Sequence, residues 1–155
     1  MRLIDKLQGA IGAARQRDET VTVFYLDLDG FKPVNDEFGH DAGDQILSMV
    51  GERLTSRTRA TDVVARLGGD EFVVLIDGHP EADAADALAE RLHEAFSSPF
   101  TLDGRPVTVG ASIGRAVFPT DAQDAEGLLR IADEAMFEAK RAVKARAGLR
   151  AVRAC

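Results

Sequence analysis

Two carboxylates stand side by side in a turn between two mostly apolar runs. Asp70 and Glu71 follow the pair Gly68-Gly69, and the flanking runs are residues 62–65 and 73–76. Because glycine reaches the positive φ values that tight hairpin turns require, the pattern predicts a β-hairpin with both carboxylates at its turn. Adjacent carboxylates repel each other, so a cation or a positively charged partner would stabilise them there. For the hairpin alone, a solvated acidic turn is an equally good interpretation.

A second pair of acidic residues closes a predicted buried strand. Residues 21–28 are an almost continuous apolar run, β-branched and aromatic, which is typical of a strand covered on both faces. Because side chains alternate along a strand, Asp27 and Asp29 point to the same side at its carboxyl end. If this strand neighbours the hairpin, its carboxylates join Asp70 and Glu71. Clustered carboxylates without a matching set of Lys or Arg indicate a site for a hard divalent cation such as Mg²⁺.

The residues after this strand could hold phosphate. Pro33 cannot donate to a β-ladder, so the sequence predicts that Gly30-Phe31-Lys32 forms a loop beyond the strand end. The free amides of such a loop and its single lysine could cradle phosphate groups beside the metal. Acidic cluster and loop together indicate metal-assisted phosphoryl transfer.

Two further polar residues are suited to a nucleobase. Asn35 and Asp44 offer an amide and a carboxylate, whose donors and acceptors match the edge of guanine. Each has a simpler interpretation when taken singly. Asn35 could be a turn residue, and Asp44 could be a charge near a helix N-terminus. Beside an acidic cluster, the nucleotide interpretation is favoured for both.

Composition limits the class of protein. The chain has 155 residues, 45% of them hydrophobic, which is enough for one sizeable core and predicts a single domain over 1–155. A net charge of −7 argues against a basic surface for nucleic acid or for direct membrane contact. The single cysteine, Cys155, excludes an intrachain disulfide, and no apolar run or signal sequence is evident, so we expect a cytoplasmic location.

Helical and extended patterns alternate along the chain. Together they predict an α+β domain with a central mixed, mainly antiparallel sheet of about five strands flanked by helices. The predicted elements are a helix over 3–16, a strand over 21–28, a helix over 41–58, the hairpin around Gly68, a helix over 81–96, a second hairpin pairing 100–102 with a long strand over 107–118, and a helix over 121–147.

The combined motifs resemble the GGDEF domain of bacterial diguanylate cyclases. The resemblance covers nearly the whole chain and implies the palm-like fold of nucleotide cyclases. It rests on Phe24-Tyr25-Leu26-Asp27-Leu28-Asp29-Gly30-Phe31-Lys32, Asn35-Asp36, Gly39-His40-Asp41-Ala42-Gly43-Asp44 and the segment from Arg66 to Phe72, with weaker matches at Val107-Thr108-Val109, Ser112-Ile113-Gly114, Ala132-Asp133 and Ala139-Lys140.

The resemblance implies an activity and a set of site residues. The family condenses two GTP molecules into cyclic di-GMP and releases pyrophosphate, with one GTP on each domain of a homodimer. Asp70, Glu71 and Lys32 would be catalytic. Mg²⁺, or Mn²⁺, would be held by Asp27, the Leu28 carbonyl, Asp70 and Glu71. Substrate would be bound by Gly30, Phe31, Lys32, Asn35, Asp44, Lys140 and Lys144.

The chain departs from the family pattern at its two ends. The last helix of the family commonly offers a lysine and, one turn later, an arginine to the terminal phosphates, whereas this chain has Lys140 and Lys144. Lysine keeps the charge but loses the bidentate fork, so we expect weaker phosphate binding. The usual leader resembling Asp-x-Leu-Thr-Gly-Leu is missing before Leu3, which predicts a domain excised from a longer signalling protein.

Arg59 and Asp62 precede the central hairpin and resemble the inhibitory Arg-x-x-Asp site of the family. An arginine can fork onto a phosphate or a guanine edge, and a carboxylate can accept from the base, so the pair suits the dinucleotide product. The alternative is an exposed ion pair at a helix-to-strand junction.

Three functional hypotheses remain open from the sequence. The chain could be an active cyclase, which is favoured because the matched metal and guanine positions keep their chemistry. It could instead be a regulatory module that binds GTP or cyclic di-GMP without turnover, as in composite cyclase/phosphodiesterase proteins. A purely structural role is disfavoured because clustered carboxylates are costly to keep without a ligand.

Overall fold

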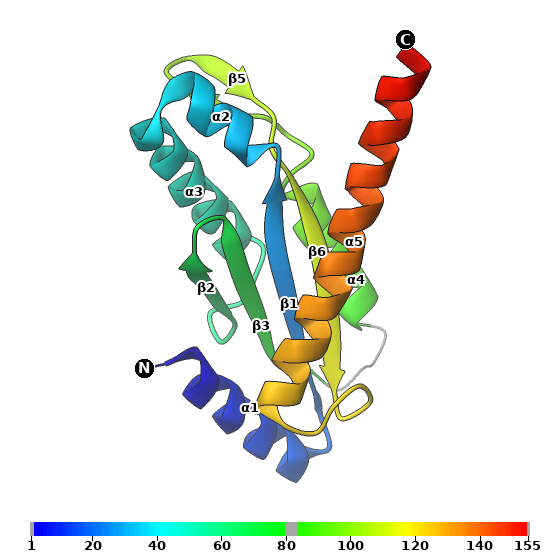
Figure 1. Cartoon of the computed structure of the whole chain (residues 1–155). Coiled ribbons are helices and arrows are strands. Elements are labelled where there is room, and N and C mark those ends of the chain that lie inside the picture. Colours follow the sequence, from blue (N-terminus) through cyan, green and yellow to red (C-terminus); the bar gives the residue numbers. More distant parts are fainter. Residues whose placement is uncertain (1, 80–83, 155) are drawn as a thin grey trace.

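The computed structural model of the chain describes residues 2–79 and 84–154, with side chains described over 2–78 and 84–146. Helices and strands alternate along it (Figure 1). The elements are α1 (Leu3–Arg17), β1 (Thr20–Asp29), α2 (Phe31–Phe38), α3 (His40–Thr55), β2 (Val63–Gly68), β3 (Glu71–His79), α4 (Ala84–Glu94), β4 (Phe100–Leu102), β5 (Arg105–Val107), β6 (Gly110–Phe118) and α5 (Ala125–Ala154).

The main sheet has the strand order β2-β3-β1-β6. β1 lies inside it and pairs antiparallel with β3 and with β6, while β2 pairs antiparallel with β3. The predicted α+β class is confirmed. The sheet has four strands where about five were expected, and all of its ladders are antiparallel where a mixed, mainly antiparallel sheet was expected. The difference arises because β4 and β5 pair only with each other, as a separate two-stranded ribbon.

Each face of the sheet is covered by its own helices (Figure 1). Phe24, Leu26 and Leu28 of β1 pack in one core cluster with residues of α2, α3 and α4. Val21 and Val23 point the other way and pack with residues of α1 and α5. This alternation follows from the two-residue period of a strand, and it places the side chains of odd-numbered β1 residues, including Asp27 and Asp29, on the α5 side.

A glycine sets how closely α5 approaches the sheet. A Cβ at Gly114 of β6 would collide with the backbone of α5 at Ala132 and Met136. The helix therefore lies directly on β6, and both Ala132 and Met136 are buried. Lys140 follows Met136 by four residues, so the same face of α5 carries its side chain to the carboxyl end of β1.

The loop predicted after β1 is a helix. Gly30, with φ of 79°, ends the strand, and α2 begins at the next residue, Phe31. Pro33 lies in the first turn of α2, where the missing N–H would have had no partner within the helix. The prediction that Gly30-Phe31-Lys32 forms a loop was therefore wrong, although the first amides of α2 still lack intrahelical acceptors.

Other boundaries moved by a few residues. The strand predicted over 107–118 is divided, because β5 ends at Val107 and β6 begins at Gly110. The helix predicted over 41–58 is α3, and the one predicted over 121–147 is α5. The helix predicted over 81–96 is α4, and residues 81–83 of that prediction lie outside the described part. Among the described residues, every helix is too short or too polar to cross a bilayer.

Candidate active site

Acidic side chains from β1 and the β2–β3 hairpin meet at one end of the sheet. Asp27 pairs in register with Glu71, the first residue of β3. The amide of Leu28 donates to the carbonyl of Asp70 at 3.1 Å, which ties the hairpin turn to the strand end. Gly68 and Gly69 have φ of 137° and 53°, values that favour glycine, so the turn has the backbone predicted for it. The first strand and the hairpin are therefore neighbours, as predicted.

Asp27, Asp29, Asp70 and Glu71 together form what we call the acidic centre. Within it, the pKa of Asp27 is clearly raised. Burial raises its pKa, the neighbouring Asp70 raises it further, and Lys140 only partly opposes them, so that the pKa reaches about 6. Its Oδ1 atom is buried without a hydrogen-bond partner. A carboxylate in this state is stabilised by an added cation or hydrogen-bond donor.

Lys140 of α5 places its ammonium group within this acidic centre. The Nζ atom donates to the carbonyl of Leu28 and to Oδ1 of Asp29, both at 2.8 Å, and lies 3.6 Å from Oδ2 of Asp27. Asp29 also accepts from the hydroxyl of the buried Ser112 at 3.0 Å. The structure thus groups Lys140 with the proposed metal ligands. Lys144, one turn further along α5, is exposed.

Sequence reasoning missed two participants in the acidic centre, Tyr25 and Ser112. Tyr25 donates its hydroxyl to Oε2 of Glu71 at 3.2 Å, and burial followed by the charge of Glu71 raises the pKa of Tyr25 to about 12. Ser112, which donates to Asp29, was predicted only as part of a family match, whereas Asp29 itself was predicted to join the cluster. The two-residue spacing of Tyr25, Asp27 and Asp29 on β1 was the available signal, since it puts all three on one face.

A small pocket of about 290 Å³ lies beside the acidic centre, between the hairpin turn and the paired helices α2 and α3. It contains most of the residues predicted to bind substrate and also reaches Asp70. Its lining residues are Phe31, Lys32, Asn35, His40, Asp44, Leu47, Arg66, Gly69 and Asp70.

Asn35 is held in this small pocket by the close packing of α2 on α3. A Cβ at Gly43 of α3 would collide with the carboxamide of Asn35, so any larger residue at position 43 would push this carboxamide out of its present place. The Oδ1 atom of Asn35 is buried and has no hydrogen-bond partner. A ligand that donates a hydrogen bond here would satisfy it.

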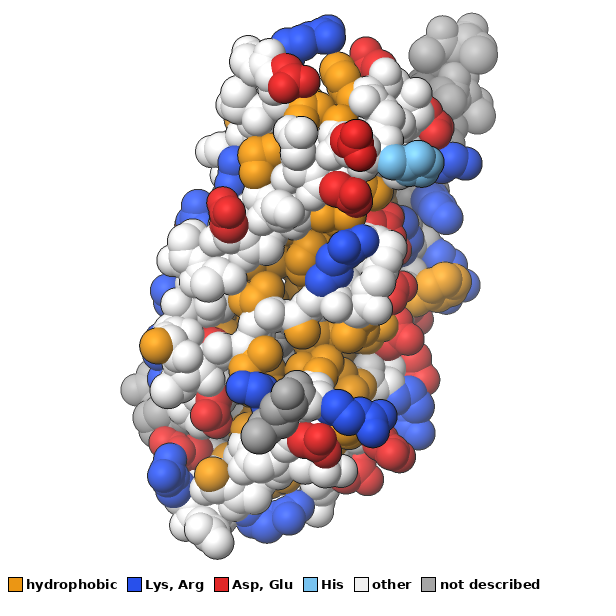
Figure 2. All heavy atoms as spheres, turned by 90° about the vertical axis from the view of Figure 1, so that its left-hand side faces the viewer, with side chains coloured by type: hydrophobic (Ala, Val, Ile, Leu, Met, Phe, Trp, Pro, Cys, Tyr) orange, Lys and Arg blue, Asp and Glu red, His pale blue; other side chains and the backbone are white. Residues whose placement is uncertain are grey.

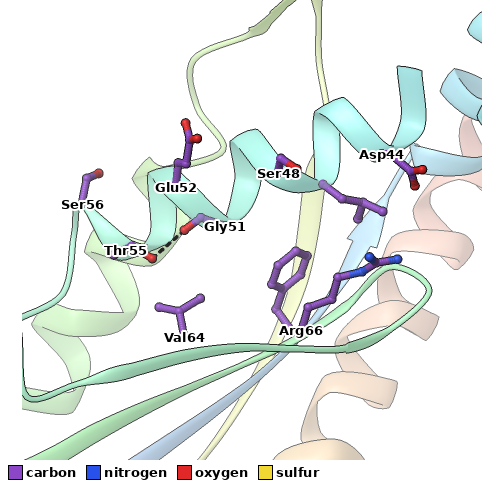
Figure 3. A pocket seen from close by; sticks show the side chains of 10 residues that line it. Asp44, Ser48, Gly51, Glu52, Thr55, Ser56, Val64 and Arg66 are labelled. Carbon is purple, nitrogen blue, oxygen red and sulfur yellow. Dashed lines mark hydrogen bonds between the residues drawn. The ribbon is translucent and has the colours of Figure 1, made fainter. Parts of the chain in front are cut away.

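A larger groove of about 720 Å³ runs from the small pocket along α3 and β2. The two hollows share Asp44, Leu47 and Arg66. Figure 3 shows Arg66 reaching from β2 toward the part of α3 that carries Asp44, and its Nε donates to the carbonyl of Gly69 at 3.1 Å. Figure 2 shows hydrophobic side chains gathered along the middle of this side of the molecule. The small pocket therefore opens into a groove with an apolar floor.

Arg59 and Asp62 lie at the opposite end of the β2–β3 hairpin. Asp62 has a side chain only 1% exposed, and it accepts from the Arg59 amide at 2.8 Å, the Arg59 guanidinium at 3.2 Å and the Asp77 amide at 3.1 Å. Arg59 also donates to the carbonyl of Asp77. The simpler prediction of an exposed ion pair holds for Arg59, which is half exposed, but not for Asp62.

The acidic centre has the chemistry of a divalent-cation site. Within the described part of the chain, no three His, Cys, Asp or Glu side chains already converge as a complete metal site. Asp27, however, has an unpartnered oxygen, and the Lys140 ammonium already brings a positive charge to the Leu28 carbonyl and to the other carboxylate oxygen of Asp27. Carboxylate and carbonyl oxygens are the ligands that hard divalent cations prefer, so the residues fit such an ion.

Comparison with known proteins decides the family. The family model described as "Diguanylate cyclase, GGDEF domain" matches residues 1–146. The chain belongs to the GGDEF domain family. It is 47% identical over 140 residues to the bifunctional diguanylate cyclase/cyclic di-GMP phosphodiesterase MucR of Pseudomonas aeruginosa, which covers 90% of this chain and only 20% of MucR.

Solved GGDEF domains have the same fold. The GGDEF domain of TpbB from Pseudomonas aeruginosa is 38% identical, with a TM-score of 0.85 over 88% of this chain and 86% of that one. The GGDEF domain of DgcB from Caulobacter crescentus, solved in complex with cyclic di-GMP, is 26% identical, with a TM-score of 0.76 over 89% of this chain and 82% of that one. The palm-like cyclase fold is therefore confirmed.

Proposed function

We propose that this GGDEF domain is a diguanylate cyclase that condenses two GTP molecules into cyclic di-GMP. Each 3′-hydroxyl oxygen bonds to the α-phosphorus of the other GTP, the bond to the β-phosphate oxygen breaks, and pyrophosphate leaves. The observation that supports this proposal most strongly is that Asp70 belongs to both the acidic centre and the pocket that contains Asn35 and Asp44. A base bound in that pocket would have its phosphates directed toward the acidic centre.

Asp27, the Leu28 carbonyl, Asp70 and Glu71 would hold Mg²⁺ or Mn²⁺. The ion supplies charge that polarises phosphoryl oxygens and stabilises the transition state. Asp70, at the hairpin turn beside the small pocket, is the candidate general base that takes the proton from the attacking hydroxyl. Tyr25 fixes Glu71 through its hydroxyl hydrogen bond.

The phosphates would be bound by the start of α2 and by lysines. Gly30 and Phe31 offer backbone amides at the N-terminal end of that helix, where the partial charge is positive. Lys32 is exposed and lines the small pocket, so its ammonium can reach a phosphate there and stabilise charge on it. Lys140 and Lys144 would approach from α5.

Asn35 and Asp44 would recognise guanine. The unsatisfied Oδ1 of Asn35 needs a donor, and a carboxylate at Asp44 accepts from the N1–H and the exocyclic amino group that guanine presents. Adenine does not offer these two donors together. Recognition of this kind discriminates strongly because a mismatched base leaves buried polar groups unpaired.

Each domain has one such nucleotide site, so catalysis would need two copies to face each other as a homodimer. Arg59 and Asp62 would bind the product at a distance from the active site and lower turnover. The domain would act within a longer cytoplasmic signalling protein, as MucR, the bifunctional relative, is much longer than the matched segment.

One observation favours a second function, a module that binds nucleotide without turnover. Lys140 lies among the proposed metal ligands and not toward the small pocket, which leaves only Lys144 on α5 for the terminal phosphates. Weak positioning of those phosphates would preserve binding of the base while slowing transfer.

Incubation of the purified chain with GTP and Mg²⁺, followed by chromatography, tests the proposal. We expect cyclic di-GMP and pyrophosphate to appear together, and ATP to give no cyclic product. GTP binding by calorimetry without any product would overturn the cyclase assignment in favour of the binding module. Neither binding nor product would refute both functions, provided that the thermal melt shows a folded chain.

A further inference from the structure

The ammonium group of Lys140 occupies the neighbourhood that the proposed function gives to a divalent cation. It donates to the carbonyl of Leu28 and to Asp29, and it lies 3.6 Å from Asp27. Two of these three groups, Leu28 and Asp27, are proposed metal ligands. The side chain of Lys140 is only 20% exposed, so its ammonium is largely enclosed by the acidic centre.

The fold, and not a chance side-chain conformation, directs Lys140 to this position. Ala132, Met136 and Lys140 recur every four residues along α5, and the first two are buried. Gly114 lets the helix backbone lie directly on β6, so the third member of this row reaches the end of β1. Figure 1 shows α5 running along the sheet past the end of β1.

We propose that Lys140 is a tethered counter-cation, which neutralises the acidic centre when no divalent ion is bound and is displaced when one binds. This inference rests on the proposed metal site. A divalent ion on Asp27 and the Leu28 carbonyl would stand within a few ångströms of the ammonium, and the two positive charges repel strongly in a partly buried site. The ammonium must then leave.

Displacement would couple metal binding to phosphate binding. The released ammonium is free to pair with a nucleotide phosphate, so the ion prepares the chain for its substrate. Because linkage is reciprocal, bound triphosphate would also favour the ion by holding Lys140 away from Leu28. Lys140 thus acts first on the metal site and only then on substrate.

Manganese binding to the nucleotide-free chain separates this role from simple phosphate binding. The free Mn²⁺ signal in electron paramagnetic resonance gives the dissociation constant for the parent, for Lys140→Met and for Arg141→Met. Arg141 is the matched control, because its exposed side chain loses the same charge next along the helix. We expect Lys140→Met to bind Mn²⁺ roughly tenfold more tightly, and Arg141→Met to bind as the parent does.

Equal affinity in the parent and Lys140→Met would overturn the inference and leave the proposed function standing. Equal tightening in both variants would also overturn it, since net charge alone would then explain the change. Absence of Mn²⁺ binding in all three chains, with and without GTP, would instead refute the metal site on which the inference rests.

A second measurement on the parent protein avoids any dependence on how Lys140→Met folds. The sequence has only four lysines, Lys6, Lys32, Lys140 and Lys144, so ¹³C-lysine signals can be assigned individually. We expect saturating Mg²⁺ to move the Lys140 ε-methylene signal toward that of the exposed Lys144. An unmoved Lys140 signal while Mg²⁺ is bound would contradict displacement.

Discussion

The carboxylates at the two ends of the β2–β3 hairpin differ in how fully they are hydrogen-bonded. Near the turn, Asp27 has an unpartnered buried oxygen and a pKa raised to about 6. At the far end, Asp62 is more deeply buried, yet it accepts four hydrogen bonds from Arg59 and Asp77. The chain itself supplies the hydrogen bonds of Asp62, whereas Asp27 keeps an oxygen that an added positive charge would stabilise. Burial alone therefore does not identify a functional carboxylate, whereas unsatisfied burial does.

The largest effect in this comparison should come from the hairpin turn. Asp70→Asn keeps the shape of the side chain but removes a charge and a strong metal ligand, so turnover of GTP should fall by more than about a hundredfold while the melting temperature is kept. Asp77→Asn is the matched control at the far end of β3 and should retain turnover. An Asp70→Asn chain that forms cyclic di-GMP at the parent rate would refute the role of this residue.

Among these changes, replacing Asp62 should lower the free energy of unfolding most. Asp62→Ala removes the acceptor of four hydrogen bonds and leaves the Asp77 amide without its partner, which we expect to lower the free energy of unfolding by about 2 kcal/mol. Urea denaturation gives the value. Asp62 would be shown to have little structural role if the variant were as stable as the parent.

A smaller effect should appear in the pH dependence of stability, and it involves Asp27. The folded chain holds a proton on Asp27 up to about pH 6, whereas the unfolded chain releases it near the ordinary value of 3.8. The folded state therefore binds more protons in this window, and stability should fall as the pH rises from about 4 to 6.

Asp27→Asn provides the control for this pH effect. The amide does not titrate, so the metal-free variant should show a shallower decline of melting temperature across the same window. Mg²⁺ should raise the melting temperature of the parent above pH 6 and have less effect on the variant. Identical pH profiles for both chains would contradict the assignment to Asp27.

The mildest change in the free chain is expected at Arg59. Its guanidinium is half exposed, and in Arg59→Ala the buried Asp62 keeps the amides of residues 59 and 77 as donors, so folding and initial turnover should stay close to the parent. Inhibition by added cyclic di-GMP should nevertheless weaken, because the fork that would hold the product is gone. Equal inhibition and equal dinucleotide binding in both chains would show that Arg59 and Asp62 make only a structural contact.

The sequence predicted those parts of the site that depend on short-range pattern. Strand alternation placed Asp27 and Asp29 on one face, and the Gly68-Gly69 pair placed the acidic turn beside them. The start of α2 was missed because Pro33 suggested a chain break, whereas proline is well tolerated in a first helical turn.

Other features depend on contacts between residues distant in sequence. No local pattern shows that Lys140 reaches the Leu28 carbonyl, because that contact depends on the packing of α5 against Gly114. The burial of Asp62 likewise follows from Asp77, fifteen residues away. Charge type could be predicted from sequence, but the partner of each charge required the tertiary structure.

The measurement that tests the cyclase assignment most directly is the specific activity of the chain, with GTP and Mg²⁺, over a wide range of protein concentrations. In the proposed function each domain binds one GTP, so two domains would have to meet for both phosphodiester bonds to form. The account predicts cyclic di-GMP as the product and a specific activity that climbs with protein concentration. A specific activity that stays flat down to nanomolar protein, or no product at any concentration, would contradict it.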